Sequence, residues 1–116
     1  MLSKDFFNKA GRISIEMAEL LSKTIFTSND MEDSFNDVFV YERYIFRPTI
    51  YEVQTFLRNK YKKHITIYSC SQESWQYRIT EPHQKLEDGI FAEDFETYEA
   101  ALVDALFVIL KQIVIN

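Results

Sequence analysis

The donor atoms suited to a soft metal ion belong to three side chains, those of His64, Cys70 and His83. Zinc sites hold such residues at short recurring spacings, whereas these three are separated by six and then thirteen residues. His64 and Cys70 fall at the two ends of one predicted strand, about 20 Å apart at about 3.3 Å per residue. One ion cannot reach both, so we predict no metal site and interpret the residues as surface histidines and a small buried thiol.

Catalytic motifs are not found in the sequence either. It contains no glycine-rich phosphate loop, no Gly-x-Ser-x-Gly elbow and no His-Glu-x-x-His motif. The acid pairs at 87–88 and 93–94 lie in predicted extended chain, where adjacent side chains point to opposite faces and cannot form a dyad. The lone Cys70 has no base near it in sequence except Lys62 and Lys63, and a lone cysteine is more typical of packing than of catalysis. We therefore predict that the protein is not an enzyme and uses no cofactor.

Charge alternates in sign along the chain, around a net value of −5. Residues 27–42 carry five acids and no base, residues 43–64 carry six bases against one acid, and residues 81–104 carry eight acids against one base. The basic stretch offers four candidates for contact with nucleic acid: Arg58, Lys60, Lys62 and Lys63. Because lysines also stabilise the negative end of a helix dipole, a solvated helix end is the competing interpretation. Pairing within the chain and solubility explain the alternation most simply.

Length and composition indicate one globular domain. The 116 residues are 47% hydrophobic and 16% aromatic, which is sufficient for a core. No apolar run approaches the roughly 20 residues that span a bilayer, and the first residues do not have the pattern of a signal peptide. A single cysteine fits a reducing compartment. We therefore expect a cytoplasmic protein with no membrane partner.

The stretch 97–113 predicts the helix around which the other elements pack. Between residues 100 and 110 its only polar side chain is Asp104, and Thr97 is placed to cap its N-terminus. Helical spacing gives this helix two apolar stripes, of which a three-stranded sheet can cover one. The second stripe contains Val103, Phe107 and Leu110.

Two further helices and an extended segment precede the predicted sheet. A helix is predicted over about residues 2–25 because apolar side chains recur there at intervals of three and four, among them Ile13, Met17 and Leu20. Aromatic and β-branched residues at 38–46 favour an extended segment. Thr49 and Glu52 then have the spacing of a capping box, which opens a helix that ends near Tyr61.

Alternating apolar and polar residues predict an antiparallel sheet. Strands are expected at 64–70 and 74–80, joined by a hairpin loop at 71–73. After a turn that contains proline, a third strand is predicted over 86–92, with Gly89 as a candidate bulge.

These elements place the chain in the α+β class. We predict an N-terminal helix and a connecting arm in residues 1–46. Residues 47–116 are predicted to form an α-β-β-β-α domain, whose three-stranded antiparallel sheet is packed by helices on one face.

Several short motifs between residues 47 and 113 resemble a known type of protein. They are Arg47-Pro48-Thr49, Phe56-Leu57-Arg58, His64-Ile65-Thr66-Ile67-Tyr68 and Tyr98-Glu99-Ala100-Ala101-Leu102. They are similar to small uncharacterised proteins of Bacteroides-type gut bacteria and their phages or mobile elements. This resemblance implies an origin and an order of elements, and it supplies no activity or site residues. The order of elements is also similar to that of double-stranded RNA-binding domains, and residues 97–102 are similar to the final helix of HicB-type antitoxins.

The start of the last helix argues against the RNA function that this topology suggests. Double-stranded RNA-binding domains attract phosphate at that position. Here it carries four acids, Glu93, Asp94, Glu96 and Glu99, which repel phosphate. Binding to nucleic acid is therefore disfavoured.

The sequence as a whole predicts a protein that acts through protein–protein contacts, most simply as a homodimer. The candidate interface combines two apolar surfaces: Ile13, Met17, Leu20, Val103, Phe107 and Leu110. Two alternatives stay open. One is a nucleic-acid-associated protein that uses the basic stretch at 43–64, and the other is an antitoxin-like or counter-defence protein whose acidic stretches cover a basic partner.

Overall fold

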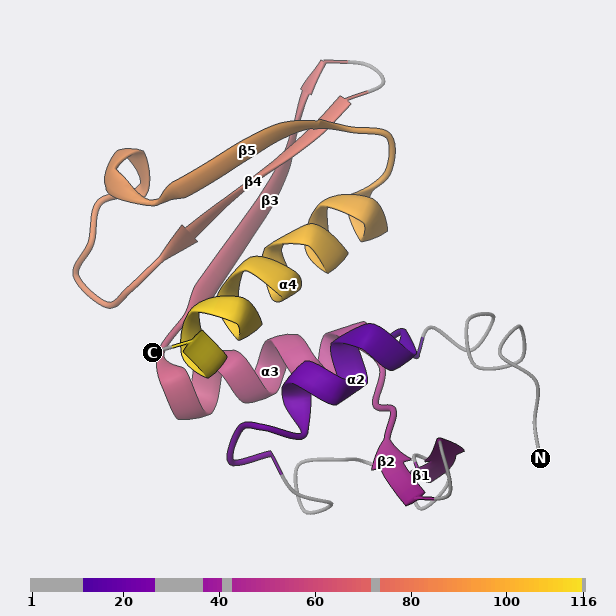
Figure 1. Cartoon of the computed structure of the whole chain (residues 1–116). Coiled ribbons are helices and arrows are strands. Elements are labelled where there is room, and N and C mark those ends of the chain that lie inside the picture. Colours follow the sequence, from indigo (N-terminus) through magenta and orange to yellow (C-terminus); the bar gives the residue numbers. More distant parts are fainter. Residues whose placement is uncertain (1–11, 27–36, 41–42, 72–73, 116) are drawn as a thin grey trace. The chain divides into compact units, whose positions relative to one another are not determined.

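The computed structural model describes residues 12–26, 37–40, 43–71 and 74–115, with the backbone alone at 37–40, 43–46, 70 and 71. Contacts divide the chain into two compact units. One unit is formed by Met1–Val53 with Leu110–Asn116, and the other by Gln54–Ile109. The structure confirms the α+β class, with an antiparallel three-stranded sheet and a helix at the C-terminus (Figure 1). The predicted division between residues 46 and 47 stays a prediction.

The sheet lies in the second unit and consists of β3 (His64–Ser71), β4 (Ser74–Thr80) and β5 (Ile90–Phe95), in that spatial order. Both pairs of neighbouring strands are antiparallel. The strands predicted at 64–70 and 74–80 are confirmed. Ser71 pairs with Ser74, so the hairpin connection falls at 72–73, outside the described residues.

One face of the sheet packs against α4 (Tyr98–Ile115). Tyr77 is buried on this face, and its hydroxyl donates a hydrogen bond of 2.6 Å to Oδ2 of Asp104 in α4. Near the start of the helix, the rings of Trp75 and Tyr98 meet edge to face with their centroids 5.6 Å apart. Asp104, the polar residue in an otherwise apolar stretch, is therefore the acceptor for a buried hydroxyl.

The prediction of a third strand at 86–92 is wrong in its bounds. Leu86–Asp88 forms a short 3-10 helix, η2, and β5 begins only at Ile90. The amide of Asp88 donates to the carbonyl of Lys85 at 3.0 Å, and that of Gly89 donates to the carbonyl of Leu86 at 3.1 Å. These bonds close a helical turn just before β5. The first residues of the predicted strand lie in this turn, so they do not pair with β4.

Gly89 does not form the bulge that was expected of it. Its backbone is extended, but an added Cβ would lie only 2.6 Å from the carbonyl oxygen of Ile79, so glycine permits a close approach of two backbones. The bulge lies further along β5, where the ladder passes from the Tyr77–Ala92 pair to the Trp75–Phe95 pair.

The capping box at the start of α3 (Ile50–Tyr61) is confirmed. The amide of Thr49 donates to Oε1 of Glu52 at 3.0 Å, and the amide of Glu52 donates to Oγ1 of Thr49 at 3.2 Å. The predicted cap of the last helix is confirmed as well, because the amide of Ala100 donates to Oγ1 of Thr97 at 3.0 Å. These side chains satisfy amides that the first turns of the helices leave without partners.

The helix predicted over residues 2–25 is shorter within the described residues. α2 spans Ile15–Leu21, and Ser14 caps it by accepting a hydrogen bond from the amide of Met17 at 3.2 Å. The prediction is wrong at 12–14, where Arg12 forms an antiparallel bridge with Thr49 and leaves the helical conformation. It is also wrong at 22–25, which form a turn, and residues 2–11 lie outside the described residues.

Of the segment predicted to be extended at 38–46, residues 38–40 and 43–46 are extended, and residues 41–42 lie outside the described residues. The segment contains two antiparallel strands, β1 (Asp37–Val40) and β2 (Arg43–Phe46). Just after β2, the side chain of Arg47 is buried, and its Nε donates to the carbonyl oxygen of Ile13 at 2.8 Å. Desolvation, and then the charge of Arg12, lower the pKa of this guanidinium. Burial of a charged side chain requires such hydrogen bonds, so Arg47 ties the residues before α2 to those before α3.

Candidate interaction surface

The residues predicted to form a dimer interface differ in exposure. Ile13, Met17 and Leu110 are buried within the chain. The other three, Leu20, Val103 and Phe107, are half-buried. A second copy of the chain would therefore meet only the latter side chains directly.

The four basic residues proposed for contact with nucleic acid lie at the end of α3 and just after it. Arg58, Lys60 and Lys62 are exposed, and Lys62 donates from Nζ to the carbonyl oxygen of Asn59 at 3.2 Å. Lys63 forms an ion pair with Glu81, and this contact lowers the pKa of the Glu81 carboxyl. Two of the four cations thus have partners in the chain, and the nucleic-acid hypothesis stays a prediction.

The candidate metal ligands lie at separate positions, His64 and Cys70 near the two ends of β3 and His83 after β4. His64 begins β3, His83 lies in the turn after β4, and the side chain of Cys70 lies outside the described residues. Among the described side chains, no three or more His, Cys, Asp or Glu are grouped to hold a metal ion. Within the same part of the chain, no helix is long and apolar enough to cross a membrane.

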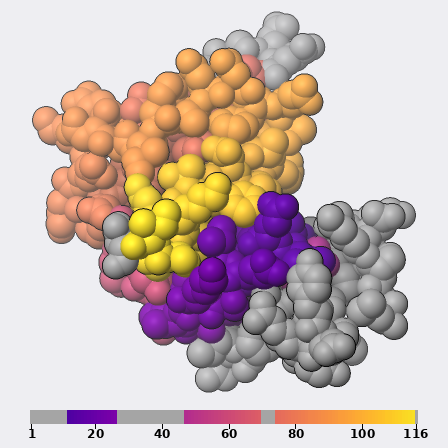
Figure 2. Space-filling view, in the orientation of Figure 1, coloured from indigo at the N-terminus to yellow at the C-terminus, as the bar shows by residue number. Residues whose placement is uncertain are grey.

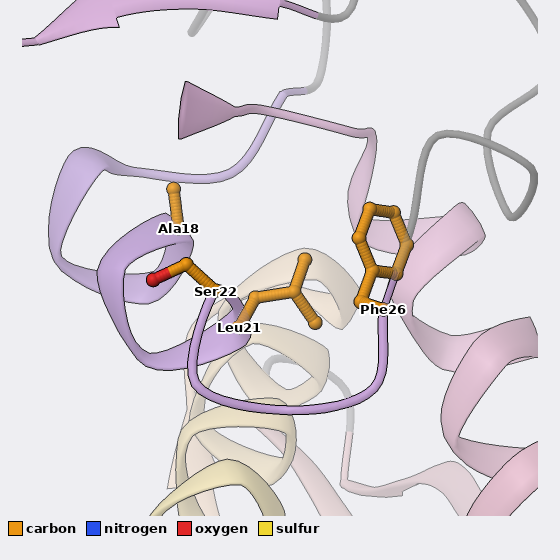
Figure 3. Close-up of a pocket in the computed structure, with 4 residues that line it drawn as sticks. All are labelled: Ala18, Leu21, Ser22 and Phe26. Carbon is orange, nitrogen blue, oxygen red and sulfur yellow. The ribbon is translucent and has the colours of Figure 1, made fainter. Parts of the chain in front are cut away.

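A small pocket in the first unit is lined by Ala18, Leu21, Ser22 and Phe26 (Figure 3). Its volume is about 20 Å³, close to the minimum that admits one water molecule. Sites for metabolites are on the order of 300–1,000 Å³, so this hollow is too small to hold one.

Exposed apolar side chains gather in one short segment of the second unit. Leu86 in η2 and Ile90 and Phe91 in β5 are 46%, 39% and 41% exposed. We call these three residues the β5 edge patch. The segment that contains them, coloured orange, contributes to the visible surface in Figure 2. Among the side chains that the structure describes, the other large exposed apolar ones are Ile25, Tyr51 and Ile115, which are distant in sequence from one another and from the patch.

Strand β5 is an edge strand in the described sheet, because the strand order is β3-β4-β5. Ile90 is opposite Ile79 and Phe91 is opposite Arg78, so the two apolar side chains lie on opposite faces of β5. Alternate residues of an edge strand direct their N–H and C=O groups away from the sheet. The patch therefore combines apolar side chains with backbone groups available for pairing.

The side chain of Arg78 contacts the β5 edge patch on the face of the sheet opposite α4. Its guanidinium carbon lies 4.4 Å from the centroid of the Phe91 ring, in a cation–π contact. Its Nε donates to the hydroxyl of Tyr68 at 3.3 Å, and its Nη1 donates to the carbonyl oxygen of Glu87 at 3.4 Å. One side chain thus joins β3, β5 and η2. Tyr68 lies on this face, whereas Trp75 and Tyr77 lie on the face that packs against α4.

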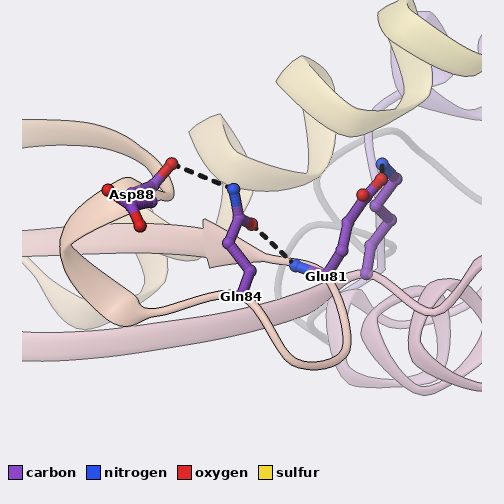
Figure 4. A network of polar contacts seen from close by, with 4 residues as sticks. Glu81, Gln84 and Asp88 are labelled. Carbon is purple, nitrogen blue, oxygen red and sulfur yellow. Dashed lines mark hydrogen bonds and ion pairs between the residues drawn. The ribbon is translucent and has the colours of Figure 1, made fainter.

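A network of hydrogen bonds fixes the turn that precedes η2 (Figure 4). Gln84 accepts from the amide of Glu81 through Oε1 at 2.9 Å and donates from Nε2 to the carbonyl oxygen of Asp88 at 3.0 Å. The amide of Gln84 in turn donates to the carbonyl of Glu81 at 3.0 Å. His83 has a φ of 68°, as in the third position of a turn with proline second. These contacts fix the backbone on both sides of Leu86, whose side chain is exposed.

Acidic side chains flank Ile90 and Phe91 of the β5 edge patch in the sequence. Residues 85–96 contain five acids against Lys85, a net charge of −4. The five acids are all exposed: Glu87, Asp88, Glu93, Asp94 and Glu96. Their carboxylates form no ion pair within the described part of the chain. The segment thus combines an apolar edge with a net negative charge, and the guanidinium of Arg78 is the cation that lies against Phe91 on one face.

The β5 edge patch is not among the predicted site residues, because residues 86–92 are predicted to form the third strand of the sheet. An available signal was the presence of Leu86, Ile90 and Phe91 among acids, where solvated segments usually lack large apolar residues. Comparison with known proteins adds no assignment: no family model, no curated protein and no solved structure matches the chain.

Proposed function

We propose that this chain is a non-enzymatic protein that acts through contacts with other protein chains. The supporting observation is the β5 edge patch, in which Leu86, Ile90 and Phe91 are exposed in and just before the edge strand of the described sheet. Exposed apolar side chains that gather at the edge strand of a sheet are typical of interaction sites, whereas single scattered exposed apolar residues are not. The single cysteine supports a cytoplasmic setting, and the resemblance of residues 47–113 supports a phage or mobile-element origin.

Affinity capture with variants of the full chain tests this function. The change Phe91→Ser combined with Ile90→Ser removes the apolar surface of the edge. The control is Ile115→Ser, since Ile115 is also apolar and is 81% exposed. We expect host proteins to be retained by the wild-type chain and by the control, and lost with the double variant. Equal retention by all three chains, or by none, would contradict the proposal.

A homodimer is the simplest assembly for such a protein. Its support is the apolar second stripe of α4, where Val103 and Phe107 keep part of their surface exposed. Light scattering at micromolar concentration is expected to give twice the chain mass of 13.8 kDa. Phe107→Asp should halve that mass, because a buried carboxylate in the interface is costly. A wild-type mass of one chain that does not change on concentration would remove the dimer.

A further inference from the structure

We propose that the β5 edge patch binds an extended, basic segment of another protein, which adds to the sheet as a fourth strand beside β5. This inference rests on the proposed function and names the chemistry of the partner. The partner strand carries lysine or arginine side chains around two adjacent apolar residues.

The backbone of β5 supplies the first part of the argument. Its outer edge presents N–H and C=O groups at alternate residues, which a neighbouring extended chain can pair in the manner of β-strand addition. The bulge around Glu93 and Asp94 interrupts the ladder at one end, where Asp94 has a φ of 72°. Regular pairing is therefore concentrated at Ile90–Ala92, the half of the strand that carries the exposed apolar side chains.

The apolar side chains define the middle of the partner. Ile90 and Phe91 lie on opposite faces of β5. In a paired strand, adjacent residues also point to opposite faces, so two consecutive apolar residues would contact Ile90 on one face and Phe91 on the other. Leu86, which is also exposed, lies in η2, four residues before Ile90 in the sequence.

Charge decides between a second copy of this chain and a different protein. Two β5 edges brought together would place a net charge of −4 from residues 85–96 against the same charge on the partner. Like charges across an interface oppose association, whereas a basic segment would neutralise exposed carboxylates. The negative charge of residues 85–96 therefore favours a basic partner strand over the β5 edge of a second copy of the chain.

Contacts within the chain also fix the conformation of the β5 edge patch before a partner binds. Gln84 fixes the turn before η2, and Arg78 contacts both Phe91 and the carbonyl of Glu87. Gly89 lets the chain pass close to Ile79 as it enters β5. A surface fixed in this way loses little conformational entropy when a partner binds.

The experiment titrates the full chain into three labelled peptides and measures fluorescence anisotropy. The probe is Lys-Val-Lys-Val-Ile-Lys-Val-Lys. A second peptide has glutamate in place of lysine, and a third keeps the charge but has proline at the two central apolar positions, where it cannot pair as a strand. We expect the first peptide alone to bind, with its Kd rising about tenfold or more between about 50 and about 500 mM salt.

Hydrogen exchange and variants locate the complex. The amides within Ile90–Ala92 that point away from β4 should exchange more slowly when the basic peptide is bound. Ile90→Ser with Phe91→Ser should weaken binding by about tenfold or more, and Ile115→Ser should leave it unchanged.

Equal binding of the proline peptide would show charge attraction without strand pairing and would overturn the inference. Slowed exchange of Ile90–Ala92 on raising the protein concentration alone would show that a second copy occupies the edge, and would also overturn it. If the basic peptide does not bind although the Ile90 and Phe91 variants still lose captured host protein, the basic-strand inference fails and the proposed function stands.

Discussion

Replacing Tyr77 by phenylalanine removes one hydroxyl from the core and should change how stability depends on pH. The hydroxyl donates at 2.6 Å to the half-buried carboxylate of Asp104. A hydrogen bond to a charged group contributes about 1.5–3 kcal/mol, and partial exposure of Asp104 lets water replace part of it. At neutral pH we therefore expect Tyr77→Phe to lower the free energy of unfolding by about 1–2 kcal/mol.

The alkaline range gives the sharper test. Burial raises the pKa of the Tyr77 hydroxyl, and the hydrogen bond and charge of Asp104 raise it further. In the unfolded chain the hydroxyl ionises near its ordinary pKa of 10.0. Above that pH the unfolded state releases a proton that the folded state keeps, so this contribution to stability is complete below pH 10.0 and falls as the pH rises. The wild-type chain should lose up to about 1.4 kcal/mol more per pH unit than Tyr77→Phe.

Urea unfolding followed by the fluorescence of Trp75, the single tryptophan, measures both effects. Tyr68→Phe is the matched control, because that hydroxyl lies on the other face of the sheet and accepts a hydrogen bond from Arg78. We expect this control to keep the pH-dependent contribution of Tyr77, because it leaves the hydrogen bond to Asp104 unchanged. A difference between wild type and Tyr77→Phe that stays constant from about pH 8 to about pH 11 would refute the reasoning, since it would show that burial does not affect ionisation of this group.

Three further predictions concern single positions and one cluster. Gly89→Ala should destabilise the chain by about 1–3 kcal/mol in thermal or urea unfolding, because the new Cβ would lie 2.6 Å from the carbonyl of Ile79. Lys62→Gly should stabilise it by up to about 1 kcal/mol in the same assay, because Lys62 has a φ of 58°, which glycine adopts without strain. Neither duplex nor single-stranded nucleic acid should be retained at about 50 mM salt; retention that is lost when Lys60, Lys62 and Lys63 become glutamine would establish the nucleic-acid alternative.

The elements that depend on neighbours in sequence were predicted well. The capping box of Thr49 and Glu52 depends on two side chains three residues apart, and both of its hydrogen bonds are present. The hairpin of β3 and β4 depends on alternation within each strand, and its register follows from burial of the face that carries Tyr77.

Features that depend on contacts between distant residues were not predicted. The helix expected over 2–25 begins at Ile15 in the described residues, because the backbone at 12–13 pairs with residues 48–49, which no local pattern in 2–25 reveals. The start of β5 was misplaced for a similar reason, since Gly89 is required by the carbonyl of Ile79 on another strand. The β5 edge patch was not predicted for the same reason, because it consists of residues around the true start of β5.

The pairing of Arg12 with Thr49 has a consequence for the order in which the chain folds. α2 is seven residues long, well below the roughly 12–15 residues that a helix needs to persist alone in water. Its support comes from Arg47, whose side chain binds the carbonyl of Ile13, and from Pro48, whose carbonyl accepts from the amide of Ile13. During synthesis these partners follow the helix by more than 25 residues. The first described helix in the sequence is therefore stabilised only after Arg47 and Pro48 have been synthesised. The β3–β4 hairpin, in contrast, has its pairing partners within its own 17 residues.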